Sequence, residues 1–153
     1  MKTIGISIEE WCKLAEEGIR IPVEVTLAGA SMQPLIRMNR DTVVIEPLDG
    51  EVRIGDIVLF RRADGAYVVH RVYKVSGEMV VTLGDNCERP DAPIRKEQVL
   101  GRVTCIRRGD KNIVPDSPAQ RKKGIRSMKM LPVRKEYLHL KHAVKKKLCR
   151  KRK

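Results

Sequence analysis

The sequence predicts a small, mainly β domain, either a sandwich or a coiled barrel. Short runs rich in β-branched residues recur between turn signals, about 8 to 12 residues apart. Asp64-Gly65 and Gly109-Asp110 are turn signals that separate such runs, as in β-hairpins. The length of 153 residues and the hydrophobic content of 42% are enough for one modest core, which favours a single β domain.

The elements are predicted in chain order. Ser7 and Glu10 form a capping-box signal before an amphipathic run that stops at Gly18, so a short N-terminal helix is expected. A loop or turn is expected over Gly29 to Pro34. The expected strands cover residues 22–27, 42–45, 57–62, 66–75, 79–83, 98–107 and 113–114.

Charge divides the chain unevenly. Residues 1–116 carry 17 basic and 18 acidic side chains, whereas residues 117–153 carry 15 basic and 1 acidic. The predicted organisation is therefore a short N-terminal helix over 1–20, a β body over 21–116 and a basic C-terminal tail over 117–153. A nearly neutral body argues against nucleic-acid binding by that body.

The tail is predicted to be broken by Pro118, Gly124 and Pro132, with a helix over residues 133–147. Three interpretations of its charge stay open: a solvated disordered segment, peripheral contact with an anionic membrane surface, or nucleic-acid binding. Nucleic acid is the least favoured partner, because the tail has one aromatic residue, Tyr137, on which bases could stack.

Several classes of protein are disfavoured by what the sequence lacks. It has no apolar run long enough to span a membrane and no apolar segment typical of a secretory signal, so a cytoplasmic protein, or one peripheral at a membrane surface, is expected. Its cysteines form no C-x-x-C pair, so we expect no metal and no cofactor. The four cysteines are Cys12, Cys87, Cys105 and Cys149.

Three stretches carry residues that could act together in acyl transfer. Ser31 stands in a Gly- and Pro-containing bend that could present a hydroxyl nucleophile and backbone N–H donors. His70 lies within a predicted strand, and an imidazole can serve as a base near neutral pH. Asp85 and Asp91 lie in one turn-rich loop, and either could orient the imidazole. Alone, each residue is more typical of a turn or of a core.

In order, these stretches resemble the catalytic core shared by type I signal peptidases and LexA-like self-cleaving repressors. The resemblance covers about residues 21 to 107 and implies the small coiled β-sheet fold of that superfamily. It rests on GASMQP (29–34), DTVV (41–44), RIGDIVLFRR (53–62), YVVHRVYKV (67–75), LGDN (83–86) with Asp91, and GRV (101–103).

The resemblance also implies roles for these residues. A histidine at position 70, where bacterial signal peptidases and LexA-like proteins carry lysine, is similar to the archaeal and endoplasmic-reticulum branch. It implies that Ser31 is the nucleophile, that its backbone N–H is an oxyanion donor and that His70 is the general base. Asp91 is favoured over Asp85 to assist the base, and Asp85 is expected to be supporting.

The implied function is a serine endopeptidase that cuts an extended peptide or precursor protein after small residues. Two alternatives stay open: a self-processing regulator of LexA type, and a module that binds a peptide without cutting it. The self-processing alternative is disfavoured, because that class has a lysine base and a DNA-binding domain ahead of its serine, and neither is found here.

Overall fold

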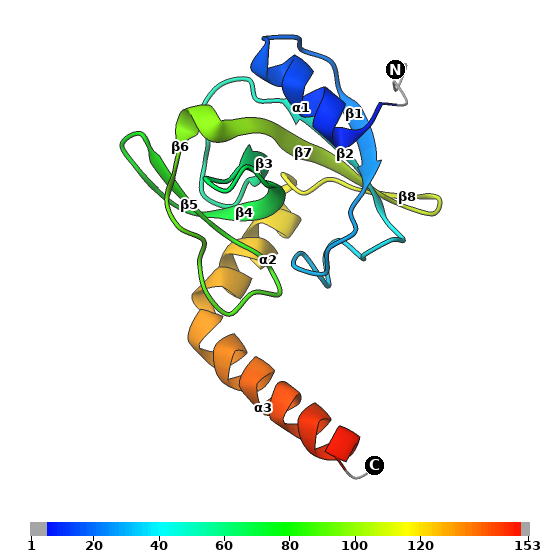
Figure 1. The fold of residues 1–153 in the computed structure, drawn as a ribbon, viewed down its shortest axis with the longest axis vertical. Coiled ribbons are helices and arrows are strands. Elements are labelled where there is room, and N and C mark those ends of the chain that lie inside the picture. Colours follow the sequence, from blue (N-terminus) through cyan, green and yellow to red (C-terminus); the bar gives the residue numbers. More distant parts are fainter. Residues whose placement is uncertain (1–5, 151–153) are drawn as a thin grey trace.

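An antiparallel sheet of eight strands forms the body of the protein (Figure 1). The computed structural model describes residues 6–150, so residues 1–5 and 151–153 of the predicted terminal segments lie outside it. The order across the sheet is β1-β2-β7-β3-β4-β5-β6, and β8 pairs with β7. The strands are β1 (Val23–Thr26), β2 (Thr42–Pro47), β3 (Ile57–Arg61), β4 (Tyr67–Ser76), β5 (Met79–Leu83), β6 (Ile94–Arg95), β7 (Val99–Arg108) and β8 (Lys111–Ile113).

The sheet curls into a half-barrel and buries side chains on both faces, which confirms the predicted mainly β fold. Along β3, Ile57 and Leu59 belong to one apolar cluster, and Val58 and Phe60 belong to another. Successive side chains of a strand point to opposite faces, so β3 lies between the two clusters. The two-residue strand β6 is absent from the sequence prediction.

The N-terminal helix α1 (Ile8–Glu16) covers the first cluster. It begins at Ser7, and the capping box with Glu10 is formed as predicted. Trp11 is 1% exposed and contributes its whole ring to the core. A side chain at Gly101 would meet this ring, which explains why β7 carries glycine under the helix.

Two C-terminal helices follow the sheet, α2 (Pro118–Lys129) and α3 (Leu131–Arg150), and α3 extends away from the body (Figure 1). The prediction that Gly124 interrupts this segment was wrong, because Gly124 lies inside α2. The segment is interrupted at Met130, beside Pro132, and the helix predicted over residues 133–147 lies within α3. Pro118 and Pro132 each occupy the first turn of a helix, where a missing N–H costs nothing. No helix among the described residues is long and apolar enough to cross a membrane.

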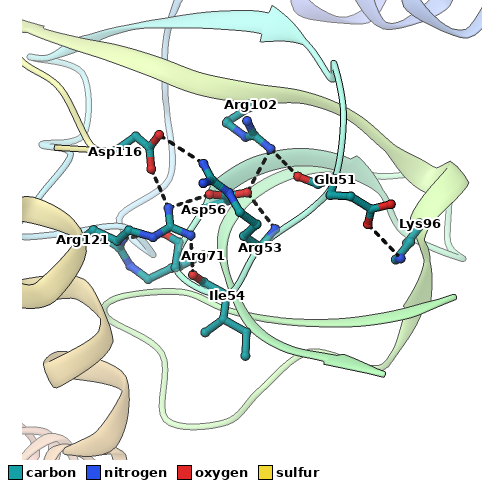
Figure 2. Close-up of polar contacts among 10 residues, drawn as sticks. Glu51, Arg53, Ile54, Asp56, Arg71, Lys96, Arg102, Asp116 and Arg121 are labelled. Carbon is teal, nitrogen blue, oxygen red and sulfur yellow. Dashed lines mark hydrogen bonds and ion pairs between the residues drawn. The ribbon is translucent and has the colours of Figure 1, made fainter. Parts of the chain in front are cut away.

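A polar network fixes α2 to the body (Figure 2). Arg121 of α2 donates to the buried Asp56 at 2.8 Å and to the carbonyl of Ile54 at 2.7 Å. Asp56 also receives the guanidinium of Arg102 at 3.0 Å and the backbone N–H of Arg53 at 2.9 Å. A buried carboxylate needs such partners, and here one of them comes from the C-terminal segment.

A second buried carboxylate fixes the segment that follows β1. Asp41 is fully buried and accepts hydrogen bonds from the Arg108 side chain, the shortest at 2.6 Å, and from the backbone N–H of Arg37 at 2.9 Å. Arg108 also donates to the carbonyl of Leu35 at 2.8 Å. These contacts tie residues 31–41 to β7. The hydrogen bonds from Arg108 lower the pKa of Asp41 to about 2.

We expect Asp41→Asn to lower the free energy of unfolding at neutral pH by about 3 kcal/mol, because it leaves Arg108 without its anion. The pKa of Asp41 is lower when folded than in the unfolded chain, where it is about 3.9. Its ionisation therefore stabilises the fold by about 2 kcal/mol above pH 4, and this is lost as the pH falls towards 2.

Urea unfolding between about pH 2 and pH 7 measures both effects. Asp110→Asn, in the exposed turn between β7 and β8, is the matched control and should change neither. Equal stability of Asp41→Asn and the wild type at pH 7 would contradict the assignment.

Candidate active site

A groove of about 680 Å³ runs between β1 and the beginning of β4. Its walls include Val25 and Leu27 on one side and Tyr67 and Val69 on the other, and Ser31 lies among its lining residues. The N-terminal end of α1 also contributes through residues 6–8, a contribution that the sequence pattern did not indicate. The groove is mostly apolar, which suits an uncharged segment of a ligand.

Two buried side chains and two hydrogen bonds fix the segment that carries Ser31. Met32 and Ile36 are each 1% exposed and anchor it in the core. The backbone N–H of Asn86 donates to the carbonyl of Ser31 at 2.7 Å, and the Asn86 side-chain amide donates to the carbonyl of Ala30 at 3.2 Å. The loop after β5 therefore fixes the backbone on which Ser31 stands.

His70 lies on β4, is 6% exposed and contacts a carboxylate. Its Nδ1 is 2.6 Å from Oδ2 of Asp91, and the hydroxyl of Thr82 donates to the same oxygen, also at 2.6 Å. The backbone N–H of Asp91 donates to the carbonyl of Thr82 at 2.8 Å. This arrangement fixes one ring nitrogen of His70 and leaves Nε2 to face the Ser31 segment. Thr82 is a supporting residue that no sequence motif indicated.

Asp85 has a different partner. Its two carboxylate oxygens accept from Nε and one terminal nitrogen of Arg71, both at 2.9 Å. Arg71 also donates to the carbonyl of Gly55 at 3.0 Å, and both members of the pair are buried. Asp85 therefore binds the residue next to His70, whereas Asp91 binds the imidazole itself.

Cys87 lies beside Nε2 of His70, the nitrogen that a serine hydroxyl would use. A Cβ placed on Gly84 would be 2.5 Å from Cys87 Sγ, 2.8 Å from the Ser31 carbonyl oxygen and 3.1 Å from His70 Nε2. The three groups thus surround one small space that only glycine leaves open. Among residues 6–147, no hydrogen bond joins the Ser31 hydroxyl to His70. Nothing in the sequence singled out Cys87.

The surroundings of His70 change its proton affinity. Burial acts to lower the pKa of His70, but hydrogen bonds to Asp91 and Cys87 outweigh burial and raise it to about 9. Burial acts to raise the pKa of Asp91, but the hydrogen bonds from His70 and Thr82 outweigh it, and the pKa is lowered. The pair is therefore an imidazolium and a carboxylate at neutral pH.

No group of three or more potential metal ligands, counting His, Cys, Asp and Glu side chains, is found within the described part of the chain. The site instead combines a hydroxyl-bearing turn that lines an apolar groove with an imidazole and a carboxylate. Such an arrangement can support acid–base and nucleophilic chemistry on a peptide carbonyl.

The fold and the site define a class of protein that comparison with known sequences identifies. The model of the Peptidase S24-like family matches residues 23–104, more than half of the chain. The chain belongs to this family, which agrees with the predicted signal-peptidase and LexA-like superfamily.

The chain is also similar in sequence to a curated protein. The signal peptidase complex catalytic subunit SEC11 of Ogataea parapolymorpha is 30% identical over 106 residues, which cover 54% of this chain and 59% of the relative. This chain thus spans about three fifths of the length of that relative. At the level of the family, the protein is therefore a Peptidase S24-like protein.

We expect the ring protons of His70 to titrate by NMR with a midpoint near pH 9, because Asp91 and Cys87 both stabilise the imidazolium. Cys87→Ala removes one of these partners and should lower the midpoint. Cys105→Ala, a half-buried cysteine on β7, is the control and should leave it unchanged. A midpoint near 6.5 in the wild type, or no shift in Cys87→Ala, would refute the contact.

Proposed function

We propose that the protein is a serine endopeptidase of the signal peptidase type, with Ser31, His70 and Asp91 as its catalytic residues. The observation that carries this proposal is the 2.6 Å contact between His70 and Asp91, which fixes the imidazole with Nε2 beside the Ser31 segment. A buried imidazole held in this way has the arrangement of the base in a serine protease triad.

In the proposed reaction, the base is the neutral form of His70, a minority at pH 7 that grows as the pH rises towards 9. The Ser31 hydroxyl attacks a peptide carbonyl while Nε2 of this neutral imidazole takes its proton. Asp91 holds Nδ1 and stabilises the imidazolium. The backbone N–H of Ser31 donates to the developing oxyanion. The imidazolium then gives its proton to the leaving amine as the C–N bond breaks. Water, activated by the same imidazole, hydrolyses the acyl-enzyme and restores the serine.

The strand edges beside the groove support an extended peptide as the substrate. β1 is an edge strand paired with β2, and in the described residues Tyr67, Val68 and Val69 of β4 pair with β3 alone. Both groove walls can therefore form backbone hydrogen bonds to a peptide strand laid between them. The groove would receive the residues before the cut, where we propose small side chains. The name of the SEC11 relative is consistent with a precursor protein as substrate.

Asp85 is proposed as a supporting residue. Both of its oxygens accept from Arg71, and within the described residues the imidazole of His70 bonds to Asp91 and not to Asp85. Asp85→Asn should therefore act through the position of the loop, whereas Asp91→Asn should act on the imidazole directly. A larger loss of turnover in Asp85→Asn than in Asp91→Asn, with both variants folded, would reverse this assignment.

Ser31→Ala and His70→Ala should each lower turnover of a fluorogenic Ala-x-Ala peptide by roughly 10⁴- to 10⁶-fold, as in other triads. A serine-reactive probe should label the wild type and not Ser31→Ala. Ser76→Ala, at the exposed end of β4, is the matched control and should retain full activity. Undiminished cleavage by purified Ser31→Ala would overturn the mechanism. Binding of the peptide without cleavage by the wild type would favour the non-catalytic alternative.

We also propose that α3 makes peripheral contact with an anionic membrane surface, with the protein cytoplasmic or at that surface. The exposed side chains Val133, Tyr137, Leu140 and Val144 follow one another at intervals of four, three and four residues, so they share one face of the helix. This face is not the one that carries the buried Leu138. Lysines flank it, and each lysine that reaches an anionic surface contributes about 1 kcal/mol.

In a flotation assay at physiological salt, the wild type should rise with vesicles that contain phosphatidylserine and stay below with neutral vesicles. Leu140→Ser should reduce the bound fraction several-fold, because it removes apolar surface from the contact face. Met79→Ser, an exposed apolar position on β5, is the control and should have no effect. Absence of wild-type binding to anionic vesicles would remove the membrane from the proposal.

A further inference from the structure

A second hollow, of about 560 Å³, lies between α3 and the loop that follows β5. It shares no lining residue with the groove between β1 and β4. The loop supplies one wall and the second and third turns of α3 supply the other. Its lining residues are Asn86, Cys87, Glu88, Arg89, Leu138, Lys141 and His142.

The groove and this hollow meet at the proposed reaction centre. Ser31 is a lining residue of the groove, while Asn86 and Cys87 line the hollow. Asn86 donates to the carbonyl of Ser31, and Cys87 Sγ lies beside Nε2 of His70. A peptide whose carbonyl lies at Ser31 and whose one half fills the groove therefore directs its other half towards the hollow.

The α3 wall of the hollow is fixed to the loop by several contacts. Leu138 is 7% exposed, and Arg134 donates to the carbonyl of Asp85. Glu88 has one oxygen 3.2 Å from Nε2 of His139 and the other 3.8 Å from Nδ1 of His142. These contacts hold the helix against the loop along two turns, so the hollow is built before any ligand arrives.

The charge of the hollow favours an anion. Arg89 and Lys141 form no ion pair or hydrogen bond with any side chain among residues 6–147. Glu88 is the carboxylate in the lining, and both of its oxygens face imidazoles of α3. Within the described part of the chain, Arg89 and Lys141 are therefore unpaired, whereas Glu88 already contacts two imidazoles. An acidic side chain of a ligand in the hollow would form ion pairs with these two cations.

We propose that this hollow is the subsite for the leaving-group side of the substrate and that it selects an acidic side chain through Arg89 and Lys141. The inference rests on the proposed endopeptidase function and names the class of substrate for it. Two partly exposed ion pairs are expected to raise kcat/KM by about three- to tenfold. The gain should shrink with added salt, since exposed charges are screened.

The test uses the full chain and three peptides that share an Ala-x-Ala segment and differ only after the cut, where they carry two Glu, two Gln or two Lys residues. The wild type should prefer them in that order by kcat/KM. Lys141→Glu and Arg89→Glu should each abolish or reverse the preference. Lys147→Glu changes the charge of the same helix outside the hollow and should preserve the preference.

The outcomes separate this inference from the proposed function. Cleavage of no peptide, with no labelling of Ser31 by a serine-reactive probe, would refute the endopeptidase itself. Cleavage of all three peptides at equal rates would leave the endopeptidase intact and overturn the subsite. An acidic preference that survives in both Lys141→Glu and Arg89→Glu, or that appears only when the Glu residues precede the cut, would also overturn it.

Discussion

The geometry of the site depends on the buried ion pair between Arg71 and Asp85. Arg71 directly follows His70 on β4, and Asp85 directly precedes Asn86, whose N–H holds the carbonyl of Ser31. One two-point contact therefore fixes the strand that carries the imidazole relative to the loop that positions the serine. Two ions taken out of water are costly unless both are well paired, and loss of either partner would leave the other buried and unpaired.

Burial of that pair requires the C-terminal segment. Gly124 of α2 lies so close to the Arg71 guanidinium that a Cβ there would be 2.4 Å from one of its terminal nitrogens. Arg121, one turn earlier, donates to Asp56 and the carbonyl of Ile54 (Figure 2). By composition alone, the basic segment over residues 117–153 looks separate from the body. In the structure, its first helix covers the buried pair beside the site. Its first helix is a layer of the fold rather than a solvated tail.

The strands and the capped N-terminal helix follow from local signals, because alternation, turn residues and the Ser7–Glu10 box act over a few residues. The ordered motifs also pointed to Ser31, His70 and Asp91. The roles of Thr82 and Cys87 could not be predicted, because they arise from long-range register and from the path of one loop. The sequence predicted Gly124 to be a helix breaker. Its actual role is to let α2 approach Arg71 closely, and this long-range contact leaves no signal in the local sequence.

The loop after β5 has two roles: its ends position the site, and its middle lines the hollow. Its Asp85 and Asp91 ends must be rigid, since they fix Arg71 and His70, while its middle, from Asn86 to Arg89, faces the hollow beneath α3. Under the proposed function, chemistry therefore depends on the β body and α2, and selection after the cut depends on Arg89 of the loop and Lys141 of α3. A change in the sequence of α3 could alter which peptides are cut without touching the contacts of the imidazole, because no side chain of α3 is among the hydrogen-bond partners of His70 in the described residues.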